Sequence, residues 1–179
     1  MFLKYNVYNE IKISYNINGT HCGGIKVKFL VFSDSHNYTN GMDKAIETHK
    51  DITHIIHLGD MADDVFYLNS VYGKTHAIKS ICGNNDFLRN DSYFHIVQAE
   101  EHRIYITHGH REHVKMSLYE LKSKAISSNC DICLFGHTHK QFYDFSDGLH
   151  ILNPGSIGYF KEQYAVLDVT KNNVNVSLY

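Results

Sequence analysis

The chain has 179 residues, of which 43% are hydrophobic and 20% charged, and its formal net charge is −2 at pH 7. This length and composition predict one globular domain and exclude an intrinsically disordered chain. The charge balance shows no basic excess that would indicate a nucleic-acid surface, and no stretch approaches the ~20 apolar residues of a membrane span.

The cysteines and the N-terminus indicate a reducing compartment. Four cysteines in a chain of this size do not resemble a disulfide framework. Cys130 and Cys133 have CxxC spacing, but they lie in the run CDICLF, which we predict to be a strand. Residues three apart on a strand face opposite sides, so we expect two buried thiols and no redox pair. With no signal peptide at the N-terminus, a cytoplasmic location is the default expectation.

Residues 1–24 differ from the rest of the chain. They are rich in Asn, Tyr and Ile and end in the glycine-containing segment NGTHCGG. This N-terminal extension is either a β-hairpin added to a sheet edge or a poorly ordered segment, and the sequence leaves both interpretations open. We assign residues 25–179 to a single domain.

A repeated pattern of short apolar runs begins after this extension. Each run ends in a polar cluster that contains Gly, Asp, Asn or His, and the runs are residues 26–32, 52–58, 76–82, 103–106, 130–135 and 149–152. Helical periodicity occurs at residues 42–50, 63–72 and 113–129. Strands that alternate with helices predict an α/β fold, in which ligands collect at the carboxyl ends of the strands.

The end of the chain, residues 163–179, reads as a hairpin with Asn172 and Asn173 near its turn. A terminal hairpin adds antiparallel strands. A mixed sheet or two packed sheets is therefore favoured over a purely parallel sheet.

The polar clusters carry side chains that are typical metal ligands. The candidates are Asp34, His36, Asp60, Asn84, His108, His137 and His139. Imidazole, carboxylate and amide groups suit Mn, Fe, Co or Zn. The i, i+2 spacing of the His137 and His139 pair would project both rings to one side of an extended backbone. The set is too large for one four-coordinate zinc and therefore favours two metals.

Two metals would define the chemistry of the site. Ions about 3.5–4 Å apart can share a hydroxide and hold both the entering and the leaving oxygen of an in-line displacement at phosphorus. Two divalent ions outweigh two carboxylates and one hydroxide, so the net charge of the site favours an anionic substrate such as a phosphate.

The ordered motifs D-x-H, G-D, G-N-x-D, H-G-H and G-H-x-H resemble the calcineurin-like metallophosphoesterase superfamily over about residues 26–170. Within it, the chain is most similar to the small YfcE-type phosphodiesterases. The resemblance implies an αββα sandwich, in which two mixed β-sheets pack face to face with helices outside.

It also implies a hydrolase that acts on small-molecule phosphoesters, most of all phosphodiesters, with the hydroxide between its metals as nucleophile. The two divalent ions would be manganese first, with Zn, Fe, Co or Ni as alternatives. The oligomeric state stays open, a homo-oligomer included.

The resemblance also implies a role for each ligand. Asp34, His36 and His139 would hold the first metal, and Asp60 would bridge the two. The second metal would be completed by Asn84, His108 and His137.

Four further residues have roles that are less fixed by the motifs. Asn85 stands where many family members have a histidine that assists the leaving group, and its amide has no titratable proton. We expect Asn85 to donate a hydrogen bond to a phosphate oxygen, and His110 to be a substrate contact or proton donor. Asp86 either orients Asn84 from behind or caps a following turn. His57 is expected to be a packed or hydrogen-bonded strand residue. Residues 153–156 resemble a loop that flanks the family's site, although turn chemistry also accounts for their Pro-Gly pair.

Two other functions compete with this interpretation. A non-catalytic scaffold that keeps the fold for protein binding would typically have lost ligand positions, and none is lost here. A binuclear hydrolase acting on amides or thioesters is less favoured, because the sequence has no HxHxDH cluster.

Overall fold

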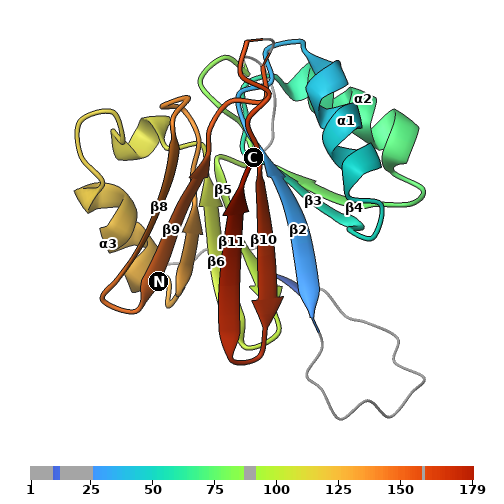
Figure 1. Cartoon of the computed structure of the whole chain (residues 1–179). Coiled ribbons are helices and arrows are strands. Elements are labelled where there is room, and N and C mark those ends of the chain that lie inside the picture. The colour runs from blue at the N-terminus through green and yellow to red at the C-terminus, as the bar shows by residue number, and fades with distance from the viewer. Residues whose placement is uncertain (1–9, 13–25, 87–91, 159) are drawn as a thin grey trace, which may run out of the picture.

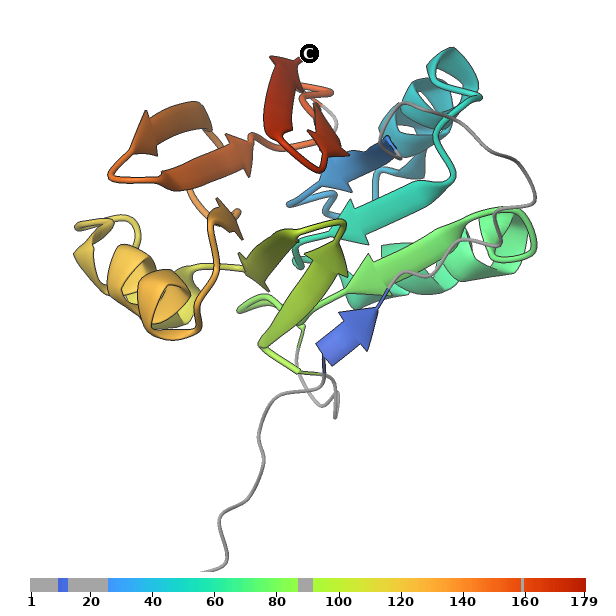
Figure 2. The same cartoon turned by 90° about the horizontal axis from the view of Figure 1, so that it is seen from below.

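The structure, a computed structural model, describes residues 10–12, 26–86, 92–158 and 160–179. Two β-sheets pack face to face, and helices cover their outer faces (Figure 1, Figure 2). The first sheet has five strands in the order β11 (Asn173–Leu178), β10 (Ala165–Thr170), β2 (Val27–Phe32), β3 (His54–His57) and β4 (Ala77–Ser80). The second has six strands in the order β1 (Glu10–Lys12), β5 (Phe94–Ala99), β6 (His102–Thr107), β7 (Ile132–Leu134), β9 (Leu149–Pro154) and β8 (Gln141–Ser146).

Both sheets are mixed. Strands β2, β3 and β4 run parallel, and β10 lies antiparallel to both β2 and β11. In the second sheet, β6, β7 and β9 run parallel, while β5 and β8 are antiparallel to their neighbours β6 and β9. The parallel strands of each sheet therefore end at a common edge, which is where the polar clusters follow them.

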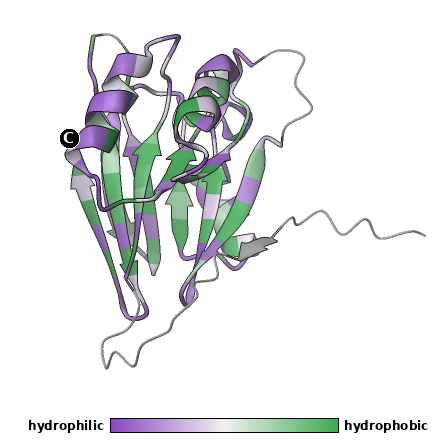
Figure 3. Cartoon of the chain, turned by 90° about the vertical axis from the view of Figure 1, so that its right-hand side faces the viewer, coloured by the Kyte–Doolittle hydropathy of each residue, from purple (hydrophilic) through white to green (hydrophobic). Residues whose placement is uncertain are grey.

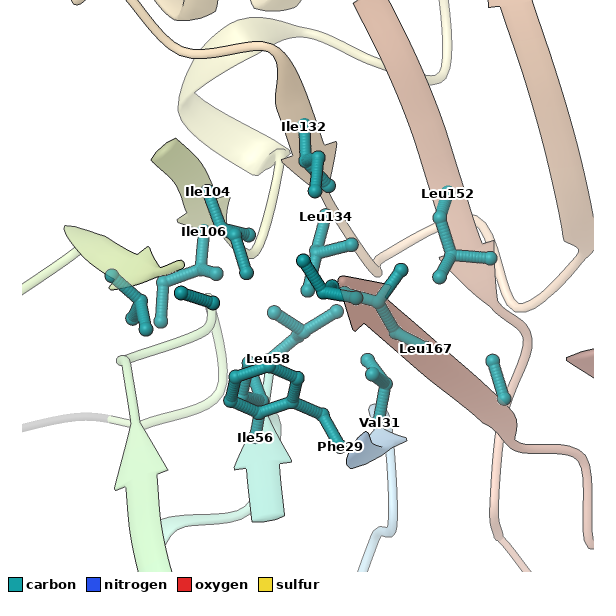
Figure 4. Close-up of a cluster of buried hydrophobic side chains, with 14 of the residues drawn as sticks. Phe29, Val31, Ile56, Leu58, Ile104, Ile106, Ile132, Leu134, Leu152 and Leu167 are labelled. Atoms are coloured by element: carbon teal, nitrogen blue, oxygen red, sulfur yellow. The ribbon is translucent and has the colours of Figure 1, made fainter. Parts of the chain in front are cut away.

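The period of two along each strand builds the central layer. Val27, Phe29 and Val31 of β2 point between the sheets, where they meet residues such as Ile104 and Ile106 of β6 (Figure 4). Figure 3 shows hydrophobic residues concentrated on the strands and hydrophilic residues on the helices and loops. Because every second residue is apolar and buried, each sheet places one face in this shared core.

The other faces of the sheets hold the helices. Leu30 and Phe32 pack with the buried residues of α1 (Thr39–Thr48) and α2 (Ala62–Tyr72). On the second sheet, Tyr105 and Cys133 pack with the buried residues of α3 (Tyr119–Ser127). The layers are therefore helix, sheet, sheet and helix, and the expected αββα sandwich is confirmed.

Several expected elements differ from the structure. We expected a helix over residues 113–129, but only Tyr119–Ser127 are helical. The chain first forms a 3₁₀ helix at His110–Glu112 and then turns before α3 begins. Strands β5 and β8 were not predicted. The terminal hairpin is confirmed as β10 and β11, which pair from Ala165 opposite Leu178 to Thr170 opposite Asn173.

The expectation that Cys130 and Cys133 face opposite sides is wrong. Both thiols are buried in the same cluster beneath α3. Strand β7 begins only at Ile132, so Cys130 lies before the strand and strand periodicity does not apply to it. The predicted burial of both thiols is confirmed.

The N-terminal extension is described at three residues only. Glu10–Lys12 form β1, a single strand parallel to β5 at the sheet edge, and residues 1–9 and 13–25 lie outside the described residues. Across the described part of the chain, none of the helices has the length and apolar character needed to span a membrane.

Candidate metal centre

The candidate ligands follow five strands of the two sheets. Asp34 and Asp60 follow the parallel strands β2 and β3, and Asn84 follows β4. His108 follows β6 and His137 follows β7 in the other sheet. The common edge of the parallel strands brings them to one end of the sandwich.

The backbone of these loops is left-handed where the sequence suggested extended residues. Asp34, His36, His137 and His139 have φ values of 55°, 47°, 66° and 55°. The predicted alignment of side chains by i, i+2 spacing in an extended backbone is therefore wrong for these residues. With Asp60 at a φ of 53°, five of the candidate ligands have a backbone conformation that is uncommon for L-amino acids other than glycine, and such conformations are typical of functional sites.

A first group of ligand atoms joins the loops after β2 and β7. The Nε2 atom of His139 lies 3.1 Å from Oδ1 of Asp34 and 3.3 Å from Nε2 of His36. Asp34 is fully buried, His139 half-buried and His36 exposed, so the group opens to solvent on one side.

The Asp34 carboxylate is adapted to a positive neighbour. Its Oδ2 accepts hydrogen bonds from Ser33 Oγ and His137 N, at 2.6 and 3.0 Å. Its Oδ1 is buried and receives no well-aligned hydrogen bond from the described residues. Burial alone would raise the pKa of Asp34, but His139 and His108 hold this pKa below its ordinary value. A buried anion with one unsatisfied oxygen fits a bound cation.

A second group of ligand atoms surrounds His108. Its Nδ1 donates to the carbonyl oxygen of Leu58 at 2.7 Å, which leaves the Nε2 lone pair directed into the site when the ring is neutral. This Nε2 lies 3.2 Å from Oδ1 of Asn84, 3.5 Å from Oδ2 of Asp60 and 3.9 Å from Oδ1 of Asp34. Electron-rich atoms this close together require a proton or a cation among them.

The electrostatics of this second group agree with that requirement. Burial would lower the pKa of His108, but the carboxylates of Asp60 and Asp34 raise it above its ordinary value. Burial alone would raise the pKa of Asp60. His108 and the backbone N–H of Asn85 outweigh this effect, so that the pKa of Asp60 lies far below its ordinary value. Asp34 is the carboxylate common to both groups of ligand atoms, whereas Asp60 belongs to the second group.

His137 lies beside both groups without belonging to either. Its ring centroid is 5.0 Å from that of His108. Burial lowers the pKa of His137 to about 4, and the charges of His108 and Lys115 add to this effect. A neutral imidazole is the form that binds metal ions.

Asn85 and His110 border the second group. The side-chain amide of Asn85 donates to Oδ2 of Asp60 at 2.7 Å, and its backbone N–H donates to Oδ1 at 2.9 Å. The ring of His110 lies 5.4 Å from that of His108 and 6.1 Å from that of His137. Burial lowers the pKa of His110, and its Nδ1 is buried with no hydrogen-bond partner among the described residues.

Asp86 ties two ligand loops together. Its Oδ2 accepts hydrogen bonds from the backbone N–H groups of Gly83 and Asp60, at 2.7 and 2.9 Å. The carboxylate therefore fixes the loop before Asn84 to the loop that carries Asp60. The sequence suggested an orienter of Asn84 or a turn cap, and these bonds show a connector between loops.

His57 is confirmed as a hydrogen-bonded strand residue behind the site. Its Nδ1 accepts from the backbone N–H of Gly59 at 3.2 Å, and its Nε2 lies 3.0 Å from Ser35 Oγ. With Nδ1 acting as acceptor, Nε2 carries the proton and donates to Ser35. The ring thereby connects the segment between Asp34 and His36 to the loop of Asp60.

Further residues support the loops that carry the candidate ligands. Ser156 Oγ donates to the carbonyl oxygen of Asp34 at 2.8 Å, and Asn153 Nδ2 donates to that of Gly136 at 2.8 Å. The segment that turn chemistry seemed to explain therefore holds two ligand loops. Glu112, buried beyond His110, accepts from Thr107 Oγ1 and from Lys124 Nζ, each at 3.0 Å. No sequence pattern marks such contacts, because they depend on how the loops fold.

Two glycines allow the close approach of these loops. A methyl group at Gly83 would overlap Oδ1 of Asp60. A methyl group at Gly136 would overlap Ser33 Oγ and would lie 2.9 Å from Oδ2 of Asp34. Both positions therefore require the absence of a side chain.

A two-sheet sandwich with imidazoles and carboxylates gathered at its strand ends defines the class of metal-dependent phosphoesterases. The family model described as the calcineurin-like phosphoesterase superfamily domain matches residues 27–172. The chain belongs to this superfamily.

Curated relatives carry corresponding names. A probable metallophosphoesterase of Mycoplasma pneumoniae is 28% identical over 133 residues, which cover 73% of this chain and 79% of the relative. A phosphodiesterase of Methanocaldococcus jannaschii is 28% identical over 145 residues, which cover 72% of this chain and 83% of the relative.

Solved structures share the fold. A predicted phosphoesterase from Streptococcus pneumoniae has a TM-score of 0.71 at 23% identity, and the match covers 86% of this chain and 89% of that one. A Vps29 single mutant from Entamoeba histolytica has a TM-score of 0.72 at 18% identity, with coverage of 86% and 92%. At these identities the likeness concerns the fold alone.

Proposed function

We propose that the protein hydrolyses small-molecule phosphoesters, phosphodiesters first, with two divalent metal ions as cofactors. The observation that carries this proposal is the buried Asp34 carboxylate, which belongs to both groups of ligand atoms and has one oxygen without an aligned hydrogen bond. The superfamily supports the same chemistry, and one curated relative is named a phosphodiesterase.

The ligands divide between two positions. Asp34, His36 and His139 would hold one ion, in keeping with their mutual contacts. Asn84, His108 and His137 would hold the other. Asp60 would contact both ions, as the family resemblance implies, and Oδ1 of Asp34, which lies 3.9 Å from His108 Nε2, would lie between the two groups. Carboxylate, imidazole and amide ligands suit manganese, and zinc, iron, cobalt or nickel are alternatives.

Two such ions, when bound, supply Lewis acidity that activates water for in-line attack on phosphorus and neutralises the substrate's charge. The residues of the chain do the rest. Asn85 would turn its amide from Asp60 toward a phosphate oxygen, since a carboxylate that binds metal no longer needs that donor. His110, beside His108 and His137, would contact the substrate or donate a proton to the leaving group.

The scaffold alternative is less favoured. The fold is shared with Vps29, but every ligand position that the motifs define is present here. A protein that had kept only a binding surface would have no need of a buried, cation-adapted carboxylate.

The direct test is Asp60→Asn. We expect it to abolish hydrolysis of bis(p-nitrophenyl) phosphate in the presence of Mn²⁺ and to weaken Mn²⁺ binding measured by equilibrium dialysis. Wild-type turnover in Asp60→Asn would contradict the proposed mechanism. Absence of bound divalent ion at micromolar concentration in the wild type would favour the scaffold.

A further inference from the structure

A groove lies beside the candidate metal centre, between β8 and the segment that leads into α3. Its volume is about 500 Å³. This size falls within the range of small-molecule sites, about 300–1,000 Å³. The apolar side chains that line it are Val114, Leu118, Phe135 and Phe142, and the exposed cations are Lys115 and Lys140.

Two ligand loops border this groove. Thr138, which separates His137 from His139, is one of the lining residues. Val114 packs against the other loop, since a methyl group at Gly109 would lie 2.8 Å from Val114 Cγ2. The groove is therefore continuous with the loops that hold His108, His137 and His139.

The aromatic side chains offer a platform for a flat ring. Phe135 is buried, and Phe142 packs edge-on against it with ring centroids 6.3 Å apart and an interplanar angle of 62°. Phe142 keeps 37% of its surface exposed, which leaves ring surface open to a ligand. Base stacking on an aromatic side chain is a common way to bind nucleotides.

The lysines give the groove a positive charge in a chain that is slightly negative overall. Lys115 and Lys140 line the groove together with Thr138, the residue between His137 and His139. An apolar groove with two cations suits a molecule that combines a flat apolar ring with anionic groups.

We propose that this groove binds the nucleoside part of a nucleotide phosphodiester, with the base against Phe142 and a further phosphate at Lys115 and Lys140. This proposal rests on the proposed function, because it places the scissile phosphate at the metal ligands. It assigns a substrate class to the site and makes Phe142 a specificity-determining residue.

Three chromogenic probes with the same leaving group test it. They are methyl p-nitrophenyl phosphate, the p-nitrophenyl ester of thymidine 5′-phosphate, and that ester with an additional 3′-phosphate. We expect wild-type kcat/KM with Mn²⁺ to rise at least about tenfold from the first probe to the second, as stacking on an aromatic side chain predicts. A further rise is expected for the third.

The variants separate the parts of the groove. Phe142→Ala should reduce the ratio of kcat/KM between the second and first probes to about one. Lys115→Ala combined with Lys140→Ala should remove the gain from the 3′-phosphate.

Phe145→Ala is the matched control: Phe145 lies on the same strand, is 58% exposed and stacks on His150, with ring centroids 4.2 Å apart. It should change neither ratio. If Phe142→Ala does not fold, Phe142→Leu removes the flat ring and keeps the apolar volume.

The outcomes are distinct. Equal kcat/KM for the first two probes in the wild type, or ratios unchanged by the Phe142 variants, would overturn the groove proposal and leave phosphoester hydrolysis standing. If the wild type cleaves none of the probes, the proposed function fails. Calorimetry with thymidine 3′,5′-bisphosphate then tests nucleotide binding by the groove alone. Binding that Phe142→Ala abolishes would support a nucleotide site there, and any other result would overturn it.

Discussion

The Nε2 atoms of His36 and His139 lie 3.3 Å apart, although one ring follows β2 and the other follows β7 in the opposite sheet. Oδ1 of Asp34 lies 3.1 Å from the same Nε2 of His139. Two ring nitrogens at this distance can share one proton or, together with the carboxylate, one cation. The contact joins the two sheets at the site.

His139→Ala should therefore weaken Mn²⁺ binding. Mutation even of outer partners of a metal site costs about 10–100-fold in affinity, and loss of a direct ligand should cost at least as much. Isothermal titration calorimetry measures this change. The control is His150→Ala, which removes an imidazole that stacks on Phe145 at the far face of β8. Equal Mn²⁺ affinity in His139→Ala and the wild type would show that His139 is not a ligand.

Gly83→Ala should disturb the site without a change of ligand. The added methyl group would overlap Oδ1 of Asp60, so that the carboxylate or the loop must move. We expect weaker Mn²⁺ binding and a lower free energy of unfolding. Gly148→Ala is the comparison, because Gly148 has a φ of 77° and open space around it. It should cost about 1 kcal/mol of stability and leave Mn²⁺ affinity unchanged. Wild-type affinity in Gly83→Ala would refute the close approach of this loop to Asp60.

His57 should make stability depend on pH. Burial lowers the pKa of His57 from 6.5 to about 4, against the opposing charges of Asp64, Asp34 and Asp86. The folded protein therefore takes up this proton less readily than the unfolded chain. The contribution of neutral His57 to the free energy of unfolding is therefore complete above pH 6.5, and it is lost as the pH falls toward about 4.

Urea unfolding in EDTA measures this effect. Relative to His57→Gln, the wild type should lose about 2 kcal/mol more of its free energy of unfolding between pH 7 and pH 5. His57→Gln retains a donor toward Ser35 and removes the titration. Parallel pH profiles of the two proteins would mean that His57 titrates alike in the folded and unfolded states.

The sequence predicts the layers well because they depend on local patterns. Alternate residues of β2, such as Phe29 and Leu30, face the central core and the helices respectively, as a strand buried on both faces requires. Strand β8 escaped prediction because it is an edge strand whose Phe142, Tyr143 and Phe145 remain partly exposed, so that no buried apolar run marks it.

The sequence predicts which side chains gather at the strand ends, but it does not predict the geometry that joins them. Residue chemistry and position at a strand end mark Asp34 and His139 as candidate ligands. Their contact depends on a left-handed backbone conformation at both residues, which the spacing of residues in the sequence does not predict. The short α3 has a similar cause. Gly109 and His113 adopt φ values of 99° and 51°, which turn the chain so that Val114 is buried beside the site before α3 begins.

The most direct test of the metal centre is a crystal of the wild-type protein soaked in MnCl₂ and measured for anomalous scattering of manganese. We expect two manganese peaks, one in contact with Asp34, His36 and His139 and the other in contact with His108, with the Asp60 carboxylate touching both. A fully soaked crystal with no peak at these side chains, or with peaks only elsewhere, would contradict it.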